Sequence, residues 1–333
     1  MKIAYFDLHK NEIHEDYSVN PRRYGGGAAF ARHAKQSLNA DGNVFKIFAA
    51  KDSFDNFIDE DNRDSAFVLS QEQINRISSG EPVGNVLKGL YDLSSFDVLM
   101  HHHCGVSLNL SGLAAKQVYW ALFYNSGIGH AVDLALLYSD RLGYSGGQRA
   151  KIAYVKLGKP VEESFCLRKK EDLIFQCSRH DEFMNSIEIA KQALKYKIKT
   201  VFAGPIFRYP LLDFIDNETT FYLGQISEKE KIEWLKRAKF STYAHNWDTV
   251  YNLSCVESLA CGTPIICSRN HFFENTLKIV DGENGFFYKG DLLECFERYD
   301  DQMQLNCYNT ALPFSEKEMV NSFVSAINSN LFN

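Results

Sequence analysis

Hydrophobic positions along the chain alternate between short continuous runs and helical repeats. The continuous runs predict strands that are buried on both faces, as in a parallel sheet. Repeats with apolar residues three and four positions apart predict helices with one buried side. The predicted strands cover residues 2–6, 44–50, 96–100, 118–123, 152–155, 173–177, 200–205, 220–224, 265–267 and 286–288. The predicted helices cover residues 131–137, 188–196, 251–261 and 315–327, and another begins with a capping box at Ser227 and Glu230.

Strand and helix alternate in both halves of the chain, and a polar stretch separates the halves. Residues 158–172 form this stretch, which contains Pro160 and ends in a cluster of charges. We therefore predict an α/β protein with two doubly wound, Rossmann-like domains that face each other across a cleft. The predicted domains are residues 1–160 and 161–314, and residues 315–333 form a C-terminal helix.

Composition narrows the class of protein. A chain of 333 residues with 45% hydrophobic residues is long enough for two cores and too apolar to be disordered. The net charge of −6 argues against nucleic acid as a partner. Eight cysteines without a CxxC pair favour buried thiols in a reducing compartment over disulfides or zinc. Because no apolar run approaches the ~20 residues that span a bilayer, we expect a cytoplasmic protein, or one attached peripherally at the inner face of the membrane.

One stretch, residues 246–288, organises the predicted chemistry. Leu253 and Val256 belong to the apolar face of its helix, and Glu257 lies among these apolar positions. A carboxylate there is costly unless it is paired, so Glu257 either binds a ligand or forms a salt bridge. The helix N-terminus near Asn252 suits phosphate, and an acid on the first turns suits sugar hydroxyls. The stretch therefore predicts a site for an anion joined to a sugar.

Two stretches in the first half carry further candidate groups. Residues 25–27 are glycines that lead into an Ala-rich helical stretch, where bare N–H groups can approach phosphate. Residues 101–104, three histidines and a cysteine, follow a predicted strand. Consecutive residues of an extended chain point to alternate faces and seldom bind one metal ion together. We therefore predict that one histidine, His103, faces a ligand at the end of the strand, with metal binding as the less favoured alternative.

Three blocks of the sequence resemble the retaining glycosyltransferases of family 4, which have the GT-B fold. The blocks are residues 219–238, 256–268 and 274–288, and their order and spacing also match. The resemblance implies a C-terminal domain that binds a nucleotide-diphosphate sugar as donor. It implies an N-terminal domain for the acceptor, which is a glycan, a lipid-linked or another hydroxyl compound, and a final helix at 315–333 that crosses back to this domain. No metal or other cofactor is implied, since cationic side chains and a helix dipole neutralise the diphosphate.

The resemblance also assigns roles to individual residues. Glu257 matches the second acid of a paired-glutamate motif that binds the ribose hydroxyls of the donor. Arg179 matches a phosphate-binding arginine, and Glu274 matches an acid beside the donor sugar. The other donor-binding positions that we predict are Gly26, Gly27, Gly204, Gln225, Ile226, Asn252 and Leu253.

The chain departs from the family pattern at three places. The first acid of the pair falls on Thr249, and Asp248 replaces it if the loop shifts by one residue; the alternative for Asp248 is a turn or cap residue. Met184 stands where a second phosphate-binding residue, a lysine, is expected. Phe123 or Tyr124 takes the place of a histidine in the catalytic cleft. The predicted catalytic residues are Asp248, Glu257 and His103.

These departures keep two other functions open beside a metal-independent, hexosyltransferase-like enzyme. One is a nucleotide-sugar 2-epimerase-like hydrolase, which uses carboxylates near the anomeric carbon without a sugar acceptor. The other is a catalytically inactive GT-B protein that binds ligand or serves as a partner subunit. Incubation with labelled nucleotide-sugars separates these functions. The transferase and the epimerase-like enzyme turn over the donor, whereas the inactive protein binds it without turnover.

Overall fold

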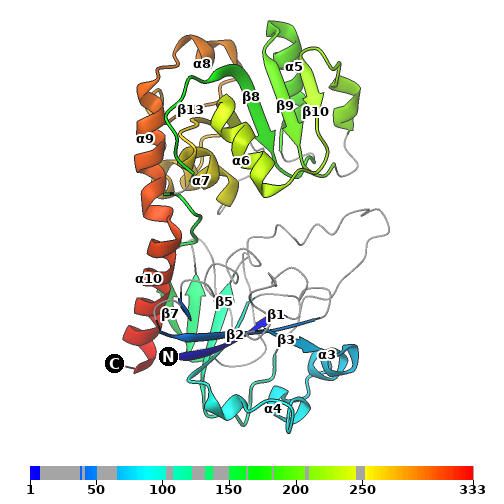
Figure 1. Cartoon of the computed structure of the whole chain (residues 1–333), viewed down its shortest axis with the longest axis vertical. Helices are drawn as coiled ribbons and strands as arrows, with labels where there is room; N and C mark the ends of the chain where they lie inside the picture. The colour runs from blue at the N-terminus through cyan, green and yellow to red at the C-terminus, as the bar shows by residue number, and fades with distance from the viewer. Residues whose placement is uncertain are drawn as a thin grey trace. The chain divides into compact units, whose positions relative to one another are not determined.

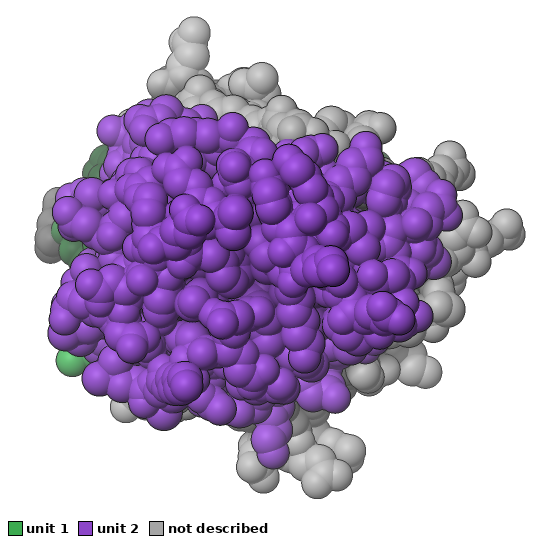
Figure 2. Space-filling model, turned by 90° about the horizontal axis from the view of Figure 1, so that it is seen from above, with its two compact units in different colours: residues 1–157, 316–333 green, residues 158–315 purple. Residues whose placement is uncertain are grey.

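A computed structural model of the chain divides into two compact units, which Figure 2 colours separately. Unit 1 consists of Met1–Leu157 together with Glu316–Asn333, and unit 2 consists of Gly158–Ser315. The residues that the structure describes are 1–7, 38–39, 42–50, 66–102, 108–121, 132–137, 150–162, 164–181, 184–206, 210–244 and 252–332.

Within the described residues, unit 1 is built on a parallel sheet of seven strands. In chain order these are β1 (Lys2–Asp7), β2 (Val44–Ala50), β3 (Ala66–Leu69), β4 (Val98–His102), β5 (Lys116–Ala121), β6 (Leu134–Leu137) and β7 (Lys151–Tyr154). Across the sheet the order is β3-β2-β1-β4-β5-β6-β7. The strand order therefore reverses between β1 and β4, as in a doubly wound fold.

The helices of unit 1 include the last helix of the chain. They are α3 (Gln71–Ser78), α4 (Val83–Val86), the 3-10 helix η3 (Leu93–Ser95), α10 (Glu316–Ile327) and the π-helix η7 (Asn328–Phe332). Helix α10 packs on β7 (Figure 1), and the hydroxyl of Ser322 accepts a hydrogen bond from the backbone N–H of Lys156 at 3.2 Å. Its apolar side, which includes Met319, Phe323 and Ile327, is buried, in agreement with the predicted amphipathic pattern.

The described part of unit 2 contains a parallel sheet of six strands. These are β8 (Glu171–Cys177), β9 (Lys199–Ala203), β10 (Thr220–Tyr222), β11 (Ala238–Tyr243), β12 (Ile265–Cys267) and β13 (Gly285–Phe287). Their order is β10-β9-β8-β11-β12-β13, so the order reverses between β8 and β11. Both sheets thus show the doubly wound, Rossmann-like arrangement that the alternation of strands and helices predicts.

Helices cover both faces of the unit 2 sheet. They are α5 (Ser186–Tyr196), the 3-10 helix η4 (Pro210–Phe214), α6 (Glu228–Arg237), α7 (Leu253–Ala260), the π-helix η5 (Phe272–Thr276), α8 (Leu293–Glu297), α9 (Gln302–Ala311) and the 3-10 helix η6 (Leu312–Phe314). On β8, Ile174 packs in a core cluster with Ile189 of α5. Its neighbour Phe175, which points to the opposite face, packs in a cluster with Leu235 of α6. Burial on both faces explains why these strands read as continuous apolar runs.

Helix α6 begins at the capping box that the sequence predicts. The hydroxyl of Ser227 accepts a hydrogen bond from the backbone N–H of Glu230, and the Glu230 carboxylate accepts one from the backbone N–H of Ser227 at 2.8 Å. Two donors that a helix start would otherwise leave unpaired are therefore satisfied. The helix ends at Arg237, and the next residue begins β11.

A buried lysine ties together the C-terminal ends of α6 and α7. Lys170, which directly precedes β8, donates hydrogen bonds from its ammonium to the carbonyls of Lys236 at 2.9 Å and Cys261 at 3.2 Å, and to the hydroxyl of Thr263 at 2.7 Å. A longer bond of 3.5 Å reaches the carbonyl of Leu235. Burial lowers the pKa of Lys170 to about 8. The ammonium thus satisfies carbonyls that helix ends leave without partners.

Several elements differ from the sequence expectation: β3, α3, α8 and α9 were not predicted, and two further differences concern the sheets. Residues 131–137, predicted as a helix, contain strand β6, and its four residues are buried between β5 and β7. A short apolar run has the same appearance in a buried strand and a buried helix, which explains the error. Strand β11 was not predicted, although it pairs with both β8 and β12. The acidic stretch at residues 52–64, expected as a solvated loop or exposed helix, lies outside the described residues.

In the described residues the helices are short or polar and the cysteines are not joined in disulfides. Each helix there is too short or too polar to cross a bilayer. The seven cysteines in this part of the chain are free thiols, and five of them are buried. Buried thiols of this kind pack as small apolar side chains.

Candidate functional site

The candidate site lies at the carboxyl edge of the unit 2 sheet. In an open, doubly wound sheet the loops that follow the strands part where the strand order reverses, and they leave a crevice beyond the carboxyl ends. Here the reversal falls between β8 and β11. The predicted residues within the described part of unit 2 follow five of its strands: Arg179 after β8, Gly204 after β9, Gln225 and Ile226 after β10, Asn252, Leu253 and Glu257 after β11, and Glu274 after β12.

Arg179 extends from the loop after β8, and its side chain is about half exposed (48%). Its guanidinium Nε lies 2.5 Å from the carboxylate of Asp181, whose side chain is 12% exposed. The mostly buried carboxylate of Asp181 therefore holds Nε of Arg179, while about half of the arginine side chain stays exposed. An arginine held in this way at the carboxyl edge is suited to bind an anion.

His180 anchors the loop that carries Arg179. Its ring is fully buried, with Nε2 at 2.9 Å from the carbonyl of Ala203 and Nδ1 at 2.8 Å from the hydroxyl of Ser186. Because a carbonyl only accepts, we assign the ring proton to Nε2, and Nδ1 then accepts from Ser186. Burial lowers the pKa of His180 to about 4. The ring is therefore neutral near pH 7, and it joins the loop to β9 and to the first residue of α5.

Gly204 permits three of the loops to pack backbone against backbone. Its φ of +113° is unfavourable for other residues, and a Cβ there would lie 2.1 Å from the carbonyl oxygen of Ser178. Its N–H donates to the carbonyl of Gly224 at 2.8 Å, and the hydroxyl of Tyr222 donates to its carbonyl at 2.7 Å. The predicted importance of Gly204 thus has a structural cause, whereas contact with a donor stays a prediction.

The loop after β10 presents two predicted residues in different environments. Gln225 is exposed, and Ile226 is partly buried against the core cluster beneath α6. Gly224, which precedes them, has a φ of +68°. The exposed side chain of Gln225 therefore stands at the rim of the same edge.

The start of α7 is fixed to the end of β11. Asn252 caps the helix, and its side-chain oxygen accepts from the backbone N–H of Ser254 at 3.0 Å. The hydroxyl of Tyr243, the last residue of β11, donates to the carbonyl of Ser254 at 2.8 Å. The N-terminus of α7, beginning at Leu253, therefore lies at the strand where the sheet order reverses, and its dipole favours an anion there.

Glu257, on the second turn of α7, is a buried carboxylate held by two lysines. Oε1 lies 2.6 Å from Nζ of Lys159, and Oε2 lies 2.9 Å from Nζ of Lys231. Lys231 is shared with Glu228, at 2.7 Å. Burial disfavours the charged carboxylate, but the two ammonium groups outweigh this and lower the pKa of Glu257 to about 2. A salt bridge, one of the two alternatives that the sequence predicts for Glu257, is therefore present. The carboxylate is ionised at neutral pH.

Glu274 lies in the π-helical segment η5, within the segment that follows β12. Its carboxylate pairs with Arg269 at 2.5 Å, and the guanidinium of Arg269 lies over the ring of Phe287, 4.2 Å from the centroid. Phe287 is the last residue of β13. A third of the Glu274 side chain is exposed. The acid is therefore oriented at the same edge of the sheet and remains accessible from solvent.

Several predicted residues lie outside the described part of the chain. These are Gly26, Gly27, His103 and Asp248, together with Thr249, Phe123 and Tyr124. Among the described residues, Met184 is buried where a second phosphate-binding lysine is expected, so its side chain belongs to the core. His101, the first histidine of its cluster, is buried beside the ring of Tyr119. Within the described residues, no three His, Cys, Asp or Glu side chains are placed to hold a metal ion.

Sequence reasoning missed Lys159, Lys231 and His180. Lys231 left a signal, because it occupies a position four before Leu235 on the buried side of α6. A lysine on an apolar face indicates a buried partner of opposite charge. Lys159 and His180 left none, since their partners are distant in sequence and only the fold brings them together.

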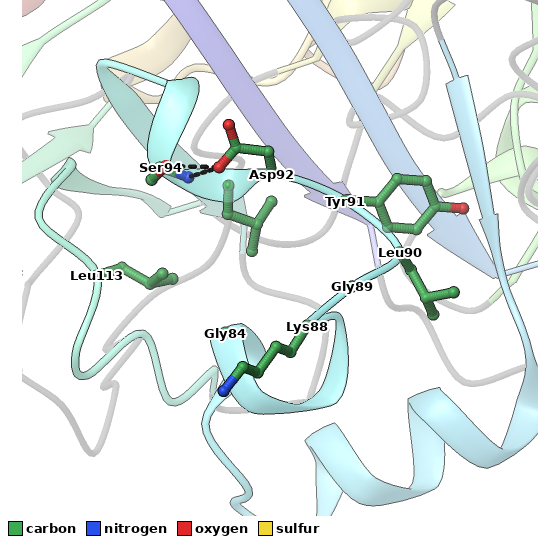
Figure 3. A pocket seen from close by; sticks show the side chains of 9 residues that line it. Gly84, Lys88, Gly89, Leu90, Tyr91, Asp92, Ser94 and Leu113 are labelled. Atoms are coloured by element: carbon green, nitrogen blue, oxygen red, sulfur yellow. Dashed lines mark hydrogen bonds between the residues drawn. The ribbon is translucent and has the colours of Figure 1, made fainter.

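A shallow pocket of about 420 Å³ in unit 1 contains none of the predicted residues (Figure 3). Its lining comes from the segments before β4 and β5, at the amino edge of the sheet. Asp92 in this lining caps η3, accepting hydrogen bonds from the backbone N–H and the hydroxyl of Ser94. The pocket is therefore at the opposite edge from the one where ligands of such sheets bind.

The fold is similar to solved glycosyltransferases over almost the whole chain. Sucrose-phosphate synthase from Thermosynechococcus elongatus is 12% identical, with a TM-score of 0.72 and 98% of each chain covered. A glycosyltransferase from Rickettsia africae is 13% identical, with a TM-score of 0.71, 100% of this chain and 99% of that chain covered. HepE from Anabaena, solved in complex with UDP and glucose, is 12% identical, with a TM-score of 0.68, 99% of this chain and 100% of that chain covered.

Comparisons of sequence found no relative. No protein-family model matches the chain, and no similar sequence was found among curated proteins. At 12–13% identity the likeness to the solved structures establishes the fold. The predicted GT-B class, with two doubly wound Rossmann-like units, is therefore confirmed.

Proposed function

We propose that the chain is a glycosyltransferase that moves a sugar from a nucleotide-diphosphate sugar to a hydroxyl group of a glycan, a lipid-linked or another acceptor. The observation that carries this proposal is the convergence of Arg179, the N-terminus of α7 and Glu257 where the strand order of unit 2 reverses. A diphosphate needs cationic groups and N–H donors, and a ribose needs a hydrogen-bond acceptor. The shared fold of glycosyltransferases, among them HepE solved with UDP, supports the same reading.

Each group has a separate role in the proposed reaction. Glu257 accepts hydrogen bonds from the ribose hydroxyls, and Arg179 binds the diphosphate together with the α7 N-terminus. Glu274 and Asp248 hold the donor sugar, with Gln225 and Ile226 beside the base. The bond from the anomeric carbon to the diphosphate oxygen breaks, the acceptor oxygen attacks the same face and its proton passes to the departing phosphate oxygen, so that configuration is retained. Fixed dipoles and cations that meet the developing phosphate charge are the main source of such catalysis.

The proposal includes three further points that rest on the resemblance. No metal ion is required, since Arg179 and the helix dipole supply the positive charge. Gly26, Gly27 and His103 act from unit 1, the glycines on the donor and His103 in catalysis. The enzyme works in the cytoplasm, either free or in peripheral contact with the membrane where its acceptor is lipid-linked.

A thermal-shift screen with the diphosphates of uridine, guanosine and adenosine tests the proposal, in EDTA and in magnesium. A ligand that binds only the folded protein stabilises it by about 2.7 kcal/mol at one hundred times its Kd. We expect one diphosphate to raise the melting temperature in EDTA as much as in magnesium. If none of the three raises it, a nucleotide-diphosphate site at this edge is ruled out for these bases. If a shift appears only in magnesium, metal independence is wrong.

A non-catalytic role is the second candidate, and one observation favours it. Met184 is buried where a phosphate-binding lysine is expected, so one cation of the family pattern is missing. Incubation with radiolabelled nucleotide-sugars separates the alternatives. Transfer to an acceptor supports the transferase, loss of the sugar without acceptor supports the epimerase-like enzyme, and binding without turnover supports the inactive subunit.

A further inference from the structure

The two lysines that hold Glu257 form a buried cluster with it at the edge of the sheet. The side chains of Lys159, Lys231 and Glu257 are 11%, 10% and 6% exposed. Each lysine binds a different carboxylate oxygen. The carboxylate is therefore fixed at both oxygens by groups from separate elements.

The lysines reach Glu257 from two separate segments of the chain. Lys231 belongs to the first turn of α6, which packs against α7 (Figure 1). Lys159 belongs to the segment that enters unit 2, where its backbone N–H donates to the carbonyl of Phe314 at 2.9 Å and the strand-like bridge continues to Ser315. Neither backbone can shift without disturbing its own packing. The orientation of Glu257 is thus determined by two supports that do not depend on each other.

Stability alone is a weak reason for such a cluster. Moving charges out of water is costly, and a buried ion pair is often no more stable than apolar side chains of the same volume. A carboxylate oxygen has two lone pairs, and one lysine on each leaves one acceptor direction per oxygen. Two neighbouring acceptors in fixed positions match two neighbouring hydroxyls. The vicinal hydroxyls of a ribose have this arrangement.

We propose that Lys159 and Lys231 are positioning residues for the nucleoside end of the donor, and that they hold the Glu257 carboxylate in the one orientation in which it accepts both ribose hydroxyls. This inference rests on the proposed nucleotide-sugar function. The lysines do not touch the ligand themselves. Their effect on binding passes through Glu257.

The charged and titratable groups around Glu257 predict a pH signature for this role. Lys231 and Glu228 face it from α6, Lys159 from the entering segment, and Cys177 and Tyr243 from the ends of β8 and β11. Burial alone would raise the pKa of Glu257, and the two lysines reverse this. Loss of one lysine should therefore move protonation of Glu257 toward the pH range of the binding experiment.

The experiment measures UDP affinity by calorimetry from pH 5.5 to 8 for the wild type and four single variants: Glu257→Gln, Lys159→Met, Lys231→Met and, as control, Lys229→Met. Lys229 lies on the same helix as Lys231 but is exposed. We expect each buried lysine variant to bind UDP about tenfold more weakly at pH 7.5 and Lys229→Met to bind normally. Relative to the wild type at the same pH, the lysine variants should lose more affinity as the pH falls, and Glu257→Gln should not.

A double-mutant cycle distinguishes positioning from direct contact with the ligand. In Lys159→Met with Glu257→Gln, Lys231 keeps its pair with Glu228, so the double variant leaves no buried charge of this cluster unpaired. If Lys159 acts through Glu257, the double variant should bind UDP as strongly as Glu257→Gln alone does. Additive losses would show that Lys159 touches UDP itself and would overturn the inference. Lys159→Arg and Lys231→Arg keep the charge, and partial recovery of affinity in them supports the proposal if a methionine variant fails to fold.

Failure of the inference is distinguishable from failure of the proposed function. If the wild type does not bind UDP or another nucleoside diphosphate, the proposed function falls, and the inference falls with it. If Glu257→Gln weakens binding while both lysine variants bind UDP as the wild type does at every pH, the function stands. The lysines are then only structural partners of Glu257, and the inference is wrong.

Discussion

Helices α6 and α7 are held by buried charges at both edges of the unit 2 sheet, and the two arrangements differ. At the amino edge, Lys170 donates to carbonyls at the ends of both helices and to one hydroxyl. An ammonium has three protons, and these acceptors use them all. At the carboxyl edge, Glu257 accepts one lysine at each oxygen and, among the described residues, keeps one acceptor direction on each. The amino edge is therefore saturated by the protein, whereas the carboxyl edge is the one where we propose that a ligand binds.

The difference shows how a buried charge can be classified by what surrounds it. A charge whose hydrogen-bonding capacity is filled by backbone groups supports the fold. A charge that is oriented by other charges, and that lies at the carboxyl ends of the strands where their order reverses, is one that we propose serves binding. Mutations at the two edges should accordingly separate stability from nucleotide affinity, and the following predictions test this, from the largest expected effect to the smallest.

The largest effect should come from Gly204 at the carboxyl edge. In Gly204→Ala, the new Cβ would lie 2.1 Å from the carbonyl oxygen of Ser178, and the backbone there cannot yield without moving the loop of Arg179. We expect a loss of more than about 4 kcal/mol in the free energy of unfolding, measured by urea denaturation. The matched control is Gly290→Ala, which has a φ of +93° but no atom within 4 Å of its Cβ, and should cost about 1 kcal/mol. Equal losses in the two variants would show that the packing at Ser178 is unimportant.

His180 at the carboxyl edge and Lys170 at the amino edge should each contribute to the pH dependence of stability. The folded-state pKa of His180 is about 4, against 6.5 unfolded, and that of Lys170 is about 8, against 10.5. Between each pair of values the unfolded chain binds more protons, so stability rises with pH. The stability from neutral His180 is complete above pH 6.5 and is lost as the pH falls toward 4, by about 3 kcal/mol. Lys170 gives a similar rise from pH 8 to 10.5. Relative to the wild type, His180→Gln should reduce the acid slope between pH 6.5 and 4.5, above the range in which Glu257 titrates. Lys170→Met should remove only the rise due to Lys170, so its stability should fall more steeply above pH 9, where buried thiols with raised pKa values oppose that rise. Slopes equal to those of the wild type in both variants would contradict the assignments.

Lys170→Met tests whether the amino edge is purely structural. The variant leaves the carbonyls of Lys236 and Cys261 without their donor, at a cost of about 2 kcal/mol in the free energy of unfolding at pH 7. We expect UDP affinity per folded molecule to stay the same. Lys239→Met removes a pair with the exposed carboxylate of Asp172 and should change neither quantity by more than about 1 kcal/mol. A tenfold loss of affinity in Lys170→Met would remove the distinction between the two edges.

Arg179→Ala sharpens the comparison within the carboxyl edge. If the guanidinium binds the diphosphate, the variant should lose about 1.5 kcal/mol of binding free energy for UDP and almost none for uridine. Arg237→Ala is the control, because this arginine pairs with Glu171 at the amino edge, and it should bind both ligands normally. Equal losses for UDP and uridine in Arg179→Ala would mean that Arg179 only supports the loop.

Much of the fold follows from local pattern in the sequence. Continuous apolar runs located most strands because both faces of each sheet are buried, and the capping box located the start of α6. Strand β11 was missed because Lys239, Ser241 and Thr242 interrupt its apolar residues. The hydroxyl of Ser241 donates to the carbonyl of Phe175 on the neighbouring strand. A polar residue whose partner lies across the sheet gives no local signal.

The site was accessible from sequence only in part. Glu257 and Arg179 were identified by their resemblance to a family pattern, and the fold places both at the carboxyl edge of one sheet. The partners that set their properties, Lys159, Lys231 and Asp181, depend on tertiary packing. The sequence predicts that a buried Glu257 needs a cationic partner, but it does not identify the residue that provides the charge. Binding of a ligand by these residues stays a prediction.

The central claim is that Glu257 receives the nucleotide at the edge where the strand order of unit 2 reverses. Calorimetric titration of the wild type and Glu257→Gln with UDP tests it most directly, with the unfolding free energy of both proteins measured in parallel. We expect the wild type to bind and the folded variant to bind about 10- to 100-fold more weakly, the loss expected for hydrogen bonds to a charged group. Equal affinities in the two proteins would contradict it and would leave Glu257 as a structural partner of its lysines.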